Sequence, residues 1–186
     1  MTRNVMLLSP VLAISLIAGS ASSQTFEEVD AAAQTVQHAG QRPFLIFTHR
    51  YALERHWSVS GFYAIGARTG PDASVHWVIR RTWWSLPNER GVLWADSRTC
   101  TGMADVLHGL ETLVGPSPAV PGRGRSVAPP APDGADHTLR QQYARDVNDA
   151  VVSLEMSGNM NSALAAWWEA TKVSLRECWT ETEPQP

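Results

Sequence analysis

The side chains of this sequence that could act together chemically are concentrated between residues 76 and 98. Here His76, Arg80, Asp96 and Arg98 stand on neighbouring segments whose polarity alternates as in strands. An arginine binds carboxylates and phosphates, an imidazole exchanges a proton near neutral pH, and a carboxylate can accept one. Arg80 and Arg98 are therefore candidate binding residues for an anion. His76, Asp96 and Arg80 are candidates for the catalytic group of a small hydrolase.

The partner of Asp96 depends on how two of these segments pair. In one register Asp96 lies opposite Arg80 on the outer face of the sheet, where water screens the pair. A shift by one residue turns Asp96 inward, opposite Arg81, where the pair is desolvated. We favour a structural ion pair between Arg81 and Asp96, because the inward register also turns three further side chains toward the core: Val92, Trp94 and Cys100.

Tryptophan is frequent in this chain, and five of its eight tryptophans lie between residues 57 and 94. Indole rings stack on sugars and cover apolar surfaces of partner proteins. Strand alternation predicts that three of these indoles share the core face: Trp57, Trp77 and Trp83. Trp84 and Trp94 remain as candidate binding residues, which makes a carbohydrate-binding module a further alternative.

The sequence motifs of common catalysts are missing from the chain. It has no phosphate-binding glycine loop, no H-E-x-x-H and no G-x-S-x-G. Among its six histidines, the spacing closest to a metal site is Asp105-x-x-His108, which is more typical of an exposed helix face. We therefore expect neither a cofactor nor a metal.

The first 23 residues have the pattern of a secretory signal peptide. Arg3 precedes an apolar run over residues 5–18, and small residues follow over 19–23. The apolar run is too short to span a bilayer of about 30 Å, so we expect cleavage near Ser23 and no membrane-spanning segment in the mature chain. This pattern predicts a periplasmic or secreted protein.

Export changes the interpretation of the two cysteines. In an oxidising compartment Cys100 and Cys178 most simply form a disulfide, which closes a loop of 78 positions. A reactive thiol would need an activating neighbour, and the residues beside either cysteine supply none.

Alternating polarity predicts an antiparallel meander of three strands between Trp57 and Cys100. Turn-forming residues at 69–73 and 85–91 separate the strands. In the first hairpin we expect three apolar pairs on the core face: Val59 beside Trp83, Tyr63 beside Ile79, and Ile65 beside Trp77.

Helical periodicity predicts helices on both sides of this meander. The predicted helical segments are 25–40, 103–114, 139–154, and a last helix capped by Asn161. Residues 44–47 fit either a strand or the start of a helix.

The remaining long segment, at about 115–136, is rich in proline and glycine and predicts a surface loop. The fold class expected from these elements is α+β. It consists of a three- to four-stranded antiparallel meander packed against N-terminal and C-terminal helices, in one domain over residues 24–186.

Charge gives the last indication of function. The chain has 18 acidic and 15 basic residues, so it lacks the basic excess of a nucleic-acid-binding protein. Residues 42–98 nevertheless hold eight arginines and only four acids. We therefore expect an exported, non-enzymatic binding or inhibitor-type protein of the cell envelope, whose partner is a protein or an anionic envelope polymer.

Overall fold

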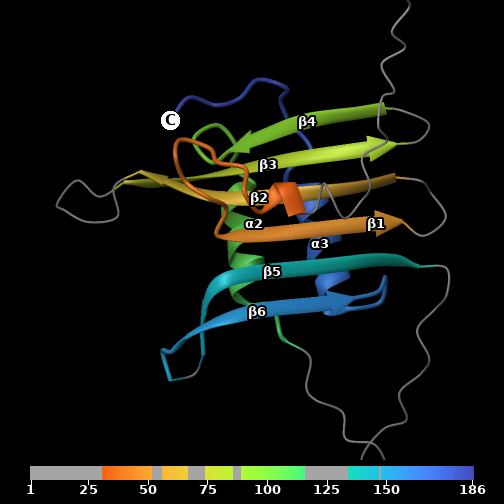
Figure 1. Cartoon of the computed structure of the whole chain (residues 1–186). Coiled ribbons are helices and arrows are strands. Elements are labelled where there is room, and N and C mark those ends of the chain that lie inside the picture. Colours follow the sequence, from red (N-terminus) through yellow and green to blue (C-terminus); the bar gives the residue numbers. More distant parts are fainter. Residues whose placement is uncertain (1–30, 52–55, 67–73, 86–88, 116–133, 147) are drawn as a thin grey trace, which may run out of the picture.

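A six-stranded antiparallel sheet forms the centre of the computed structural model (Figure 1). The structure describes residues 31–51, 56–66, 74–85, 89–115, 134–146 and 148–186. The strands are ordered β4-β3-β2-β1-β5-β6 across the sheet. In chain order the elements are β1 (Leu45–Tyr51), β2 (His56–Gly66), β3 (Val75–Ser85), β4 (Glu89–Asp96), α2 (Met103–Glu111), β5 (Ala135–Arg145), β6 (Val151–Gly158) and α3 (Ala163–Ser174).

This architecture corrects the expected α+β class, because the chain is mostly β. The three strands predicted between Trp57 and Cys100 are present as β2, β3 and β4. Within the ambiguous segment 44–47, residues 45–47 begin a strand, β1. The helix predicted over residues 139–154 is wrong, since β5 and β6 form a hairpin there. The predicted signal peptide and residues 116–133 of the predicted loop lie outside the described residues.

A tight turn explains why the segment 139–154 is a hairpin. The Asp146 carboxylate accepts hydrogen bonds from the backbone N–H groups of Asn148 and Ala150. Asp149 has φ of 62°, a left-handed conformation that interrupts a helix. The apolar residues that suggested a helical stripe are therefore divided between two strands, and Tyr143 is exposed.

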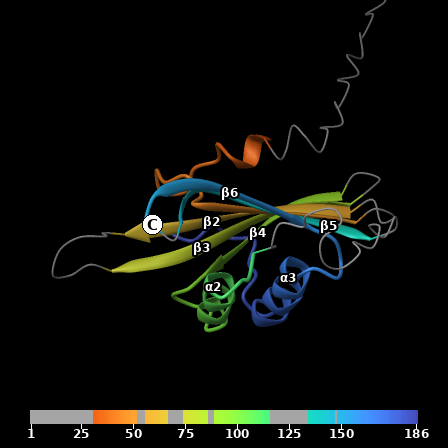
Figure 2. The same cartoon turned by 90° about the horizontal axis from the view of Figure 1, so that it is seen from below.

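Both faces of the sheet are covered, but by different parts of the chain (Figure 2). Helices α2 and α3 lie side by side on one face, which we call the helix face. The segment 31–44 crosses the other face, which we call the opposite face, and its described helical part is one short turn at residues 31–33. The N-terminal segment and the C-terminal helix therefore do not cover the same side of the sheet.

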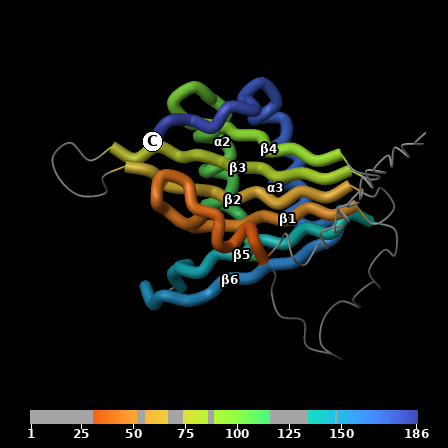
Figure 3. The backbone as a smooth tube through the Cα atoms, turned by 45° about the horizontal axis from the view of Figure 1, so that its top comes forward, coloured from red at the N-terminus to blue at the C-terminus, as the bar shows by residue number. Residues whose placement is uncertain are grey.

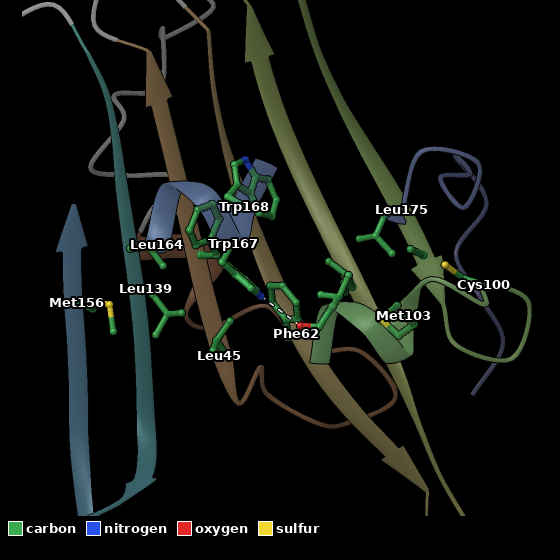
Figure 4. Close-up of a cluster of buried hydrophobic side chains, with 14 residues drawn as sticks. Leu45, Phe62, Cys100, Met103, Leu139, Met156, Leu164, Trp167, Trp168 and Leu175 are labelled. Carbon is green, nitrogen blue, oxygen red and sulfur yellow. Dashed lines mark hydrogen bonds between the residues drawn. The ribbon is translucent and has the colours of Figure 1, made fainter. Parts of the chain in front are cut away.

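The main apolar core fills the space between the helices and the sheet (Figure 4). Trp167 and Trp168 of α3 contribute its largest side chains, and the Trp167 indole donates a hydrogen bond to the backbone carbonyl of Val106 in α2. Helix α3 begins one residue later than expected, because the Ser162 hydroxyl, and not Asn161, accepts the capping hydrogen bond from Ala165.

The register of the first hairpin differs by one residue from the prediction. Val59 lies opposite Thr82, Tyr63 opposite Val78, and Ile65 opposite His76. The shift places Trp77, Ile79 and Trp83 on the helix face, whereas Trp57, Val59, Tyr63 and Ile65 lie on the opposite face. Because both faces bury apolar side chains, alternation alone could not select the register.

A disulfide between Cys100 and Cys178 is confirmed, with a Cα–Cα distance of 5.3 Å. Just after it, the C-terminal tail runs along the outer edge of β4 (Figure 3). Trp94 and Thr180 exchange two backbone hydrogen bonds of 2.8 and 2.9 Å. The disulfide therefore holds the segment that closes this edge of the sheet.

Removal of the disulfide should strongly destabilise the protein. The bond closes 78 positions, and the chain-entropy model gives about 4–5 kcal/mol for such a closure. We expect the double variant Cys100→Ser/Cys178→Ser to lose a free energy of unfolding of this order in urea titrations. Reductant should reproduce the loss in the wild type and have no effect on the double variant. A wild-type midpoint that ignores reductant would contradict this.

Candidate functional site

A row of polar side chains crosses the helix face near the C-terminal end of β1. Cross-strand pairing places His137 of β5 opposite His49 of β1, and His49 opposite Ser58 of β2. One step along the sheet, Ser60 of β2 lies opposite Arg81 of β3. Strand alternation turns all five toward the helices, because they share a face with Phe47 and Phe62 of the core. We call these five residues the polar row.

Helix α3 covers the polar row. Trp168, which is 0% exposed, lies 6.3 Å from the His49 ring between ring centroids, and Thr171 is buried one turn further along the helix. Figure 4 shows Trp168 at the margin of the apolar cluster, beyond Trp167. Beneath them His49 is 2% exposed and Ser60 0%. The polar row together with Trp168 and Thr171 is called the polar cluster below.

Several buried atoms of the polar cluster have no hydrogen-bond partner within the described part of the chain. These include both ring nitrogens of His49, the hydroxyls of Ser58, Ser60 and Thr171, the indole nitrogen of Trp168, and Nε of Arg81. A buried polar group without a partner costs about 1–3 kcal/mol, so native proteins keep few of them. Their concentration in one place sets this region apart from the apolar core beside it.

The guanidinium of Arg81 lies between two indoles. Its central carbon is 5.5 Å from the ring centroid of Trp168 and 5.7 Å from that of Trp179 in the tail. Among the described residues, no carboxylate forms a salt bridge with Arg81. Burial lowers the pKa of Arg81, and Tyr51 opposes this effect. Arg81 therefore combines partial burial and aromatic contacts with the lack of an acidic partner.

The two histidines of the polar row are neutral at neutral pH. Burial, reinforced by His137, Lys172 and Arg81, lowers the pKa of His49 to about 3. Burial also lowers the pKa of His137, although a backbone hydrogen bond at Gly158 opposes it. The rings are 4.7 Å apart between centroids. They are therefore suited to exchange hydrogen bonds rather than to carry charge.

Apart from Arg81, the candidate site residues singled out from the sequence lie on or beside the opposite face instead. Asp96 lies opposite Val78, and Arg80 lies opposite Trp94, so neither expected register is observed. Asp96 is bound by Arg98, whose Nη2 donates to Oδ2 at 2.7 Å and whose backbone N–H donates to Oδ1 at 2.8 Å. The predicted pairs of Asp96 with Arg81 and with Arg80 are therefore wrong. Arg81 points to the helix face, away from Asp96.

The other candidate binding residues contact their own chain. Arg80 lies over the Trp94 ring at 5.7 Å and donates a hydrogen bond to Thr82 at 2.7 Å. Trp94 is only 6% exposed. Trp84 stacks on Trp57 with centroids 4.0 Å apart and ring planes at 8°. These contacts account for the packing of both indoles without a ligand.

His76 lies two residues along β3 from Val78, the residue opposite Asp96. Burial and the charge of Arg98 lower the pKa of His76, whereas Asp96 opposes the change. Asp96 itself has a lowered pKa, because hydrogen bonds from Arg98 outweigh its desolvation. A catalytic role for His76, Asp96 and Arg80 stays a prediction.

A side-chain hydrogen bond that the sequence did not indicate joins the N-terminal segment to the C-terminal tail. His38 is 2% exposed, and its Nδ1 lies 2.8 Å from Oε1 of Glu183 in the tail. His38 also packs on Trp94, with ring centroids 5.0 Å apart. Nearby, Tyr63 donates a hydrogen bond to the Val36 carbonyl, and burial raises the pKa of Tyr63 to about 12. The N-terminal segment and the tail therefore meet on the opposite face.

The sequence reasoning missed the polar cluster because its residues are scattered along the chain. Ser58 and Ser60 alternate with apolar residues, which is the usual sign of a solvent-facing side. The sequence holds one indication of the cluster. Ser58 and Ser60 are two residues apart, as are Phe47 and His49, so each pair shares one face of its strand. The burial of that face became visible only once α3 was placed over it.

Metal ligation and membrane insertion receive no support from the described residues. No three histidine, cysteine, aspartate or glutamate side chains among them gather as a metal site would require. None of their helices is long and apolar enough to cross a bilayer. Comparison of the chain with protein-family models, curated proteins and solved structures found no match.

The burial of His49 should make stability depend on pH. Its folded-state pKa of about 3 lies below the ordinary value of 6.5, so the unfolded chain takes up the proton first and stability falls as pH drops from about 6.5 toward 3. From about pH 7 to about pH 4.5 this group should remove about 2–3 kcal/mol from the free energy of unfolding. In urea titrations His49→Gln should show a pH dependence weaker by that amount, whereas exposed His108→Gln should match the wild type. Equal slopes for His49→Gln and the wild type would contradict this.

The Asp96–Arg98 pair leads to a separate prediction, in which protonation removes a negative charge instead of adding a positive one. Because the folded-state pKa of Asp96 is lowered, its stabilising contribution is present above about pH 4 and is lost as pH falls through the folded-state value. Asp96→Asn should lower the urea midpoint at neutral pH, and the difference from the wild type should shrink in acid. A constant difference at all pH values would show that the charge of Asp96 is unimportant.

Proposed function

We propose that this protein is an exported, non-enzymatic binding protein that holds a small polar ligand in the polar cluster beneath α3. The observation that carries the proposal is the group of buried polar atoms without partners in the described chain, around His49, Ser58, Ser60 and Thr171. A ligand that exchanges hydrogen bonds with them would offset the desolvation penalty.

The covalent structure supports the exported location. Disulfides persist in oxidising compartments, and Cys100–Cys178 closes the tail onto the sheet. The signal-like pattern of residues 1–23 is consistent with secretion or a periplasmic location. We therefore propose a location in the cell envelope or outside the cell.

The two alternatives from the sequence have weaker support. A hydrolase would need Asp96 available to substrate, but its carboxylate is engaged by Arg98. A carbohydrate-binding face would need several exposed indoles. Of the two candidates Trp94 is covered and Trp84 is stacked on Trp57, and the exposed Trp77 stands on the other face of the sheet. An anionic partner at Arg80 and Arg98 would have to displace their present contacts with Trp94 and Asp96.

If the polar cluster lowers the stability of the ligand-free protein, removal of one of its polar atoms should raise the free energy of unfolding and weaken ligand binding. Ser60→Ala deletes a buried hydroxyl without a partner, so the ligand-free variant should gain about 1 kcal/mol in free energy of unfolding. The control is Ser157→Ala, which removes an exposed hydroxyl on the opposite face and should change little. Urea titration measures both.

The same variants test binding. Thermal unfolding of the wild type is monitored against a library of small polar metabolites, and a ligand at about 100 times its Kd should add about 2.7 kcal/mol. Compounds that stabilise the wild type and Ser157→Ala, but not Ser60→Ala or Thr171→Val, support the proposal. A clear loss of stability in ligand-free Ser60→Ala, together with no stabilising compound, would contradict it.

A further inference from the structure

We infer that the ligand of the polar cluster carries a small anionic group, a carboxylate or a phosphate, which pairs with Arg81. This inference rests on the proposed binding function and names the chemical class of its ligand. It draws on the charge of Arg81, the groups that surround it, and the kind of hydrogen bond that its neighbours can make.

Among the described residues, the groups that surround Arg81 carry no negative charge. Ser60 faces it from β2, Trp168 from α3 and Trp179 from the tail. His49 and Tyr51 of β1 also lie within electrostatic range. Arg81 is only partly buried, but its Nε is shielded from water without a partner. A partly desolvated guanidinium is stabilised when an anion pairs with it, and the described chain provides no such anion here.

Further basic groups act on the polar row. Lys172 of α3 and His56 of β2 act on His49 with the same sign as Arg81, although Lys172 is also paired with Glu169 at 2.7 Å. The acids that act in this region, Glu169 and Asp136, influence His137 at the other end of the polar row. A cation would therefore be repelled near Arg81, whereas an anion would be attracted.

The partnerless groups beside Arg81 can donate hydrogen bonds. The Trp168 indole nitrogen is a donor only, and the hydroxyls of Ser58, Ser60 and Thr171 can each donate one hydrogen bond. Carboxylate and phosphate oxygens accept several such bonds at once, and an arginine binds them through two parallel donors. A neutral sugar could use the hydroxyls, but it would leave the Arg81 charge unpaired.

Two adjacent arginines allow a matched experiment. Arg80 and Arg81 are neighbours in β3, and each guanidinium lies over an indole, but on opposite faces of the sheet. The purified full-length mature protein is titrated with inorganic phosphate, benzoate and the neutral analogue benzamide, and binding is followed by tryptophan fluorescence and calorimetry. The variants are Arg81→Gln, Arg81→Lys and the control Arg80→Gln, with circular dichroism to confirm folding.

We expect saturable binding of phosphate or benzoate, and none of benzamide. Arg81→Gln should weaken the affinity about 10- to 100-fold, because a charge-assisted hydrogen-bond pair is lost, and Arg81→Lys should restore part of it. Arg80→Gln should bind as the wild type does. Phosphate without benzoate, or the reverse, identifies which of the two groups the ligand carries. If Arg81→Gln fails to fold, the anion affinities of Arg81→Lys and Arg80→Lys are compared instead, and only Arg81→Lys should bind more weakly than the wild type.

Three results would overturn the inference. They are equal anion affinity in wild type and Arg81→Gln, measurable binding of benzamide that equals that of benzoate, and no binding of either anion. The proposed binding function would survive any of these if neutral polar compounds stabilise the wild type but not Ser60→Ala. The two failures are therefore distinguishable.

Discussion

The covalent bond between Cys100 and Cys178 is the constraint on which much of the tertiary structure depends. It joins the short connection between β4 and α2 to the segment that follows α3, and so fixes the start of the C-terminal tail. From that point Trp179 covers Arg81, Thr180 bonds to the β4 edge, and Glu183 reaches His38. One cross-link therefore positions contacts on both faces of the sheet and at its edge.

The helix face divides into two chemically different regions under neighbouring parts of the same helix. Trp167 packs among apolar side chains such as Phe47 and Phe62, where close packing supplies stability. Trp168, the next residue, contacts His49 and Arg81 in the polar cluster. Binding sites often retain such locally unfavourable groups, because a ligand rather than the fold satisfies them.

Arg80 and Arg81 show how strand alternation gives neighbouring residues different roles. Arg80 points to the opposite face, where it packs on Trp94 and donates to Thr82. Arg81 points beneath α3, where its charge lacks an acidic partner in the described chain. The sequence alone made Arg80 the binding candidate and Arg81 the structural one, whereas we propose the binding role for Arg81.

Local sequence signals determined several elements. The alternation from Trp57 to Cys100 predicted β2, β3 and β4, the stripe from Met103 predicted α2, and a polar cap before Leu164 predicted α3 to within one residue. The pairing of Cys100 with Cys178 also followed from residue type and the expected compartment. These features depend on short-range periodicity or on the presence of only two cysteines, so one sequence suffices to find them.

Tertiary structure alone decided the rest. The stripe from Leu139 to Leu154 fits a helix, but the Asp146 turn and the pairing of Leu139 with Met156 make it a hairpin. Hairpin register was ambiguous because both faces of the sheet are covered, so apolar side chains are acceptable on either side. The polar cluster forms only when four strands and α3 meet, since His137, His49, Ser58 and Arg81 are distant in sequence and adjacent through long-range pairing.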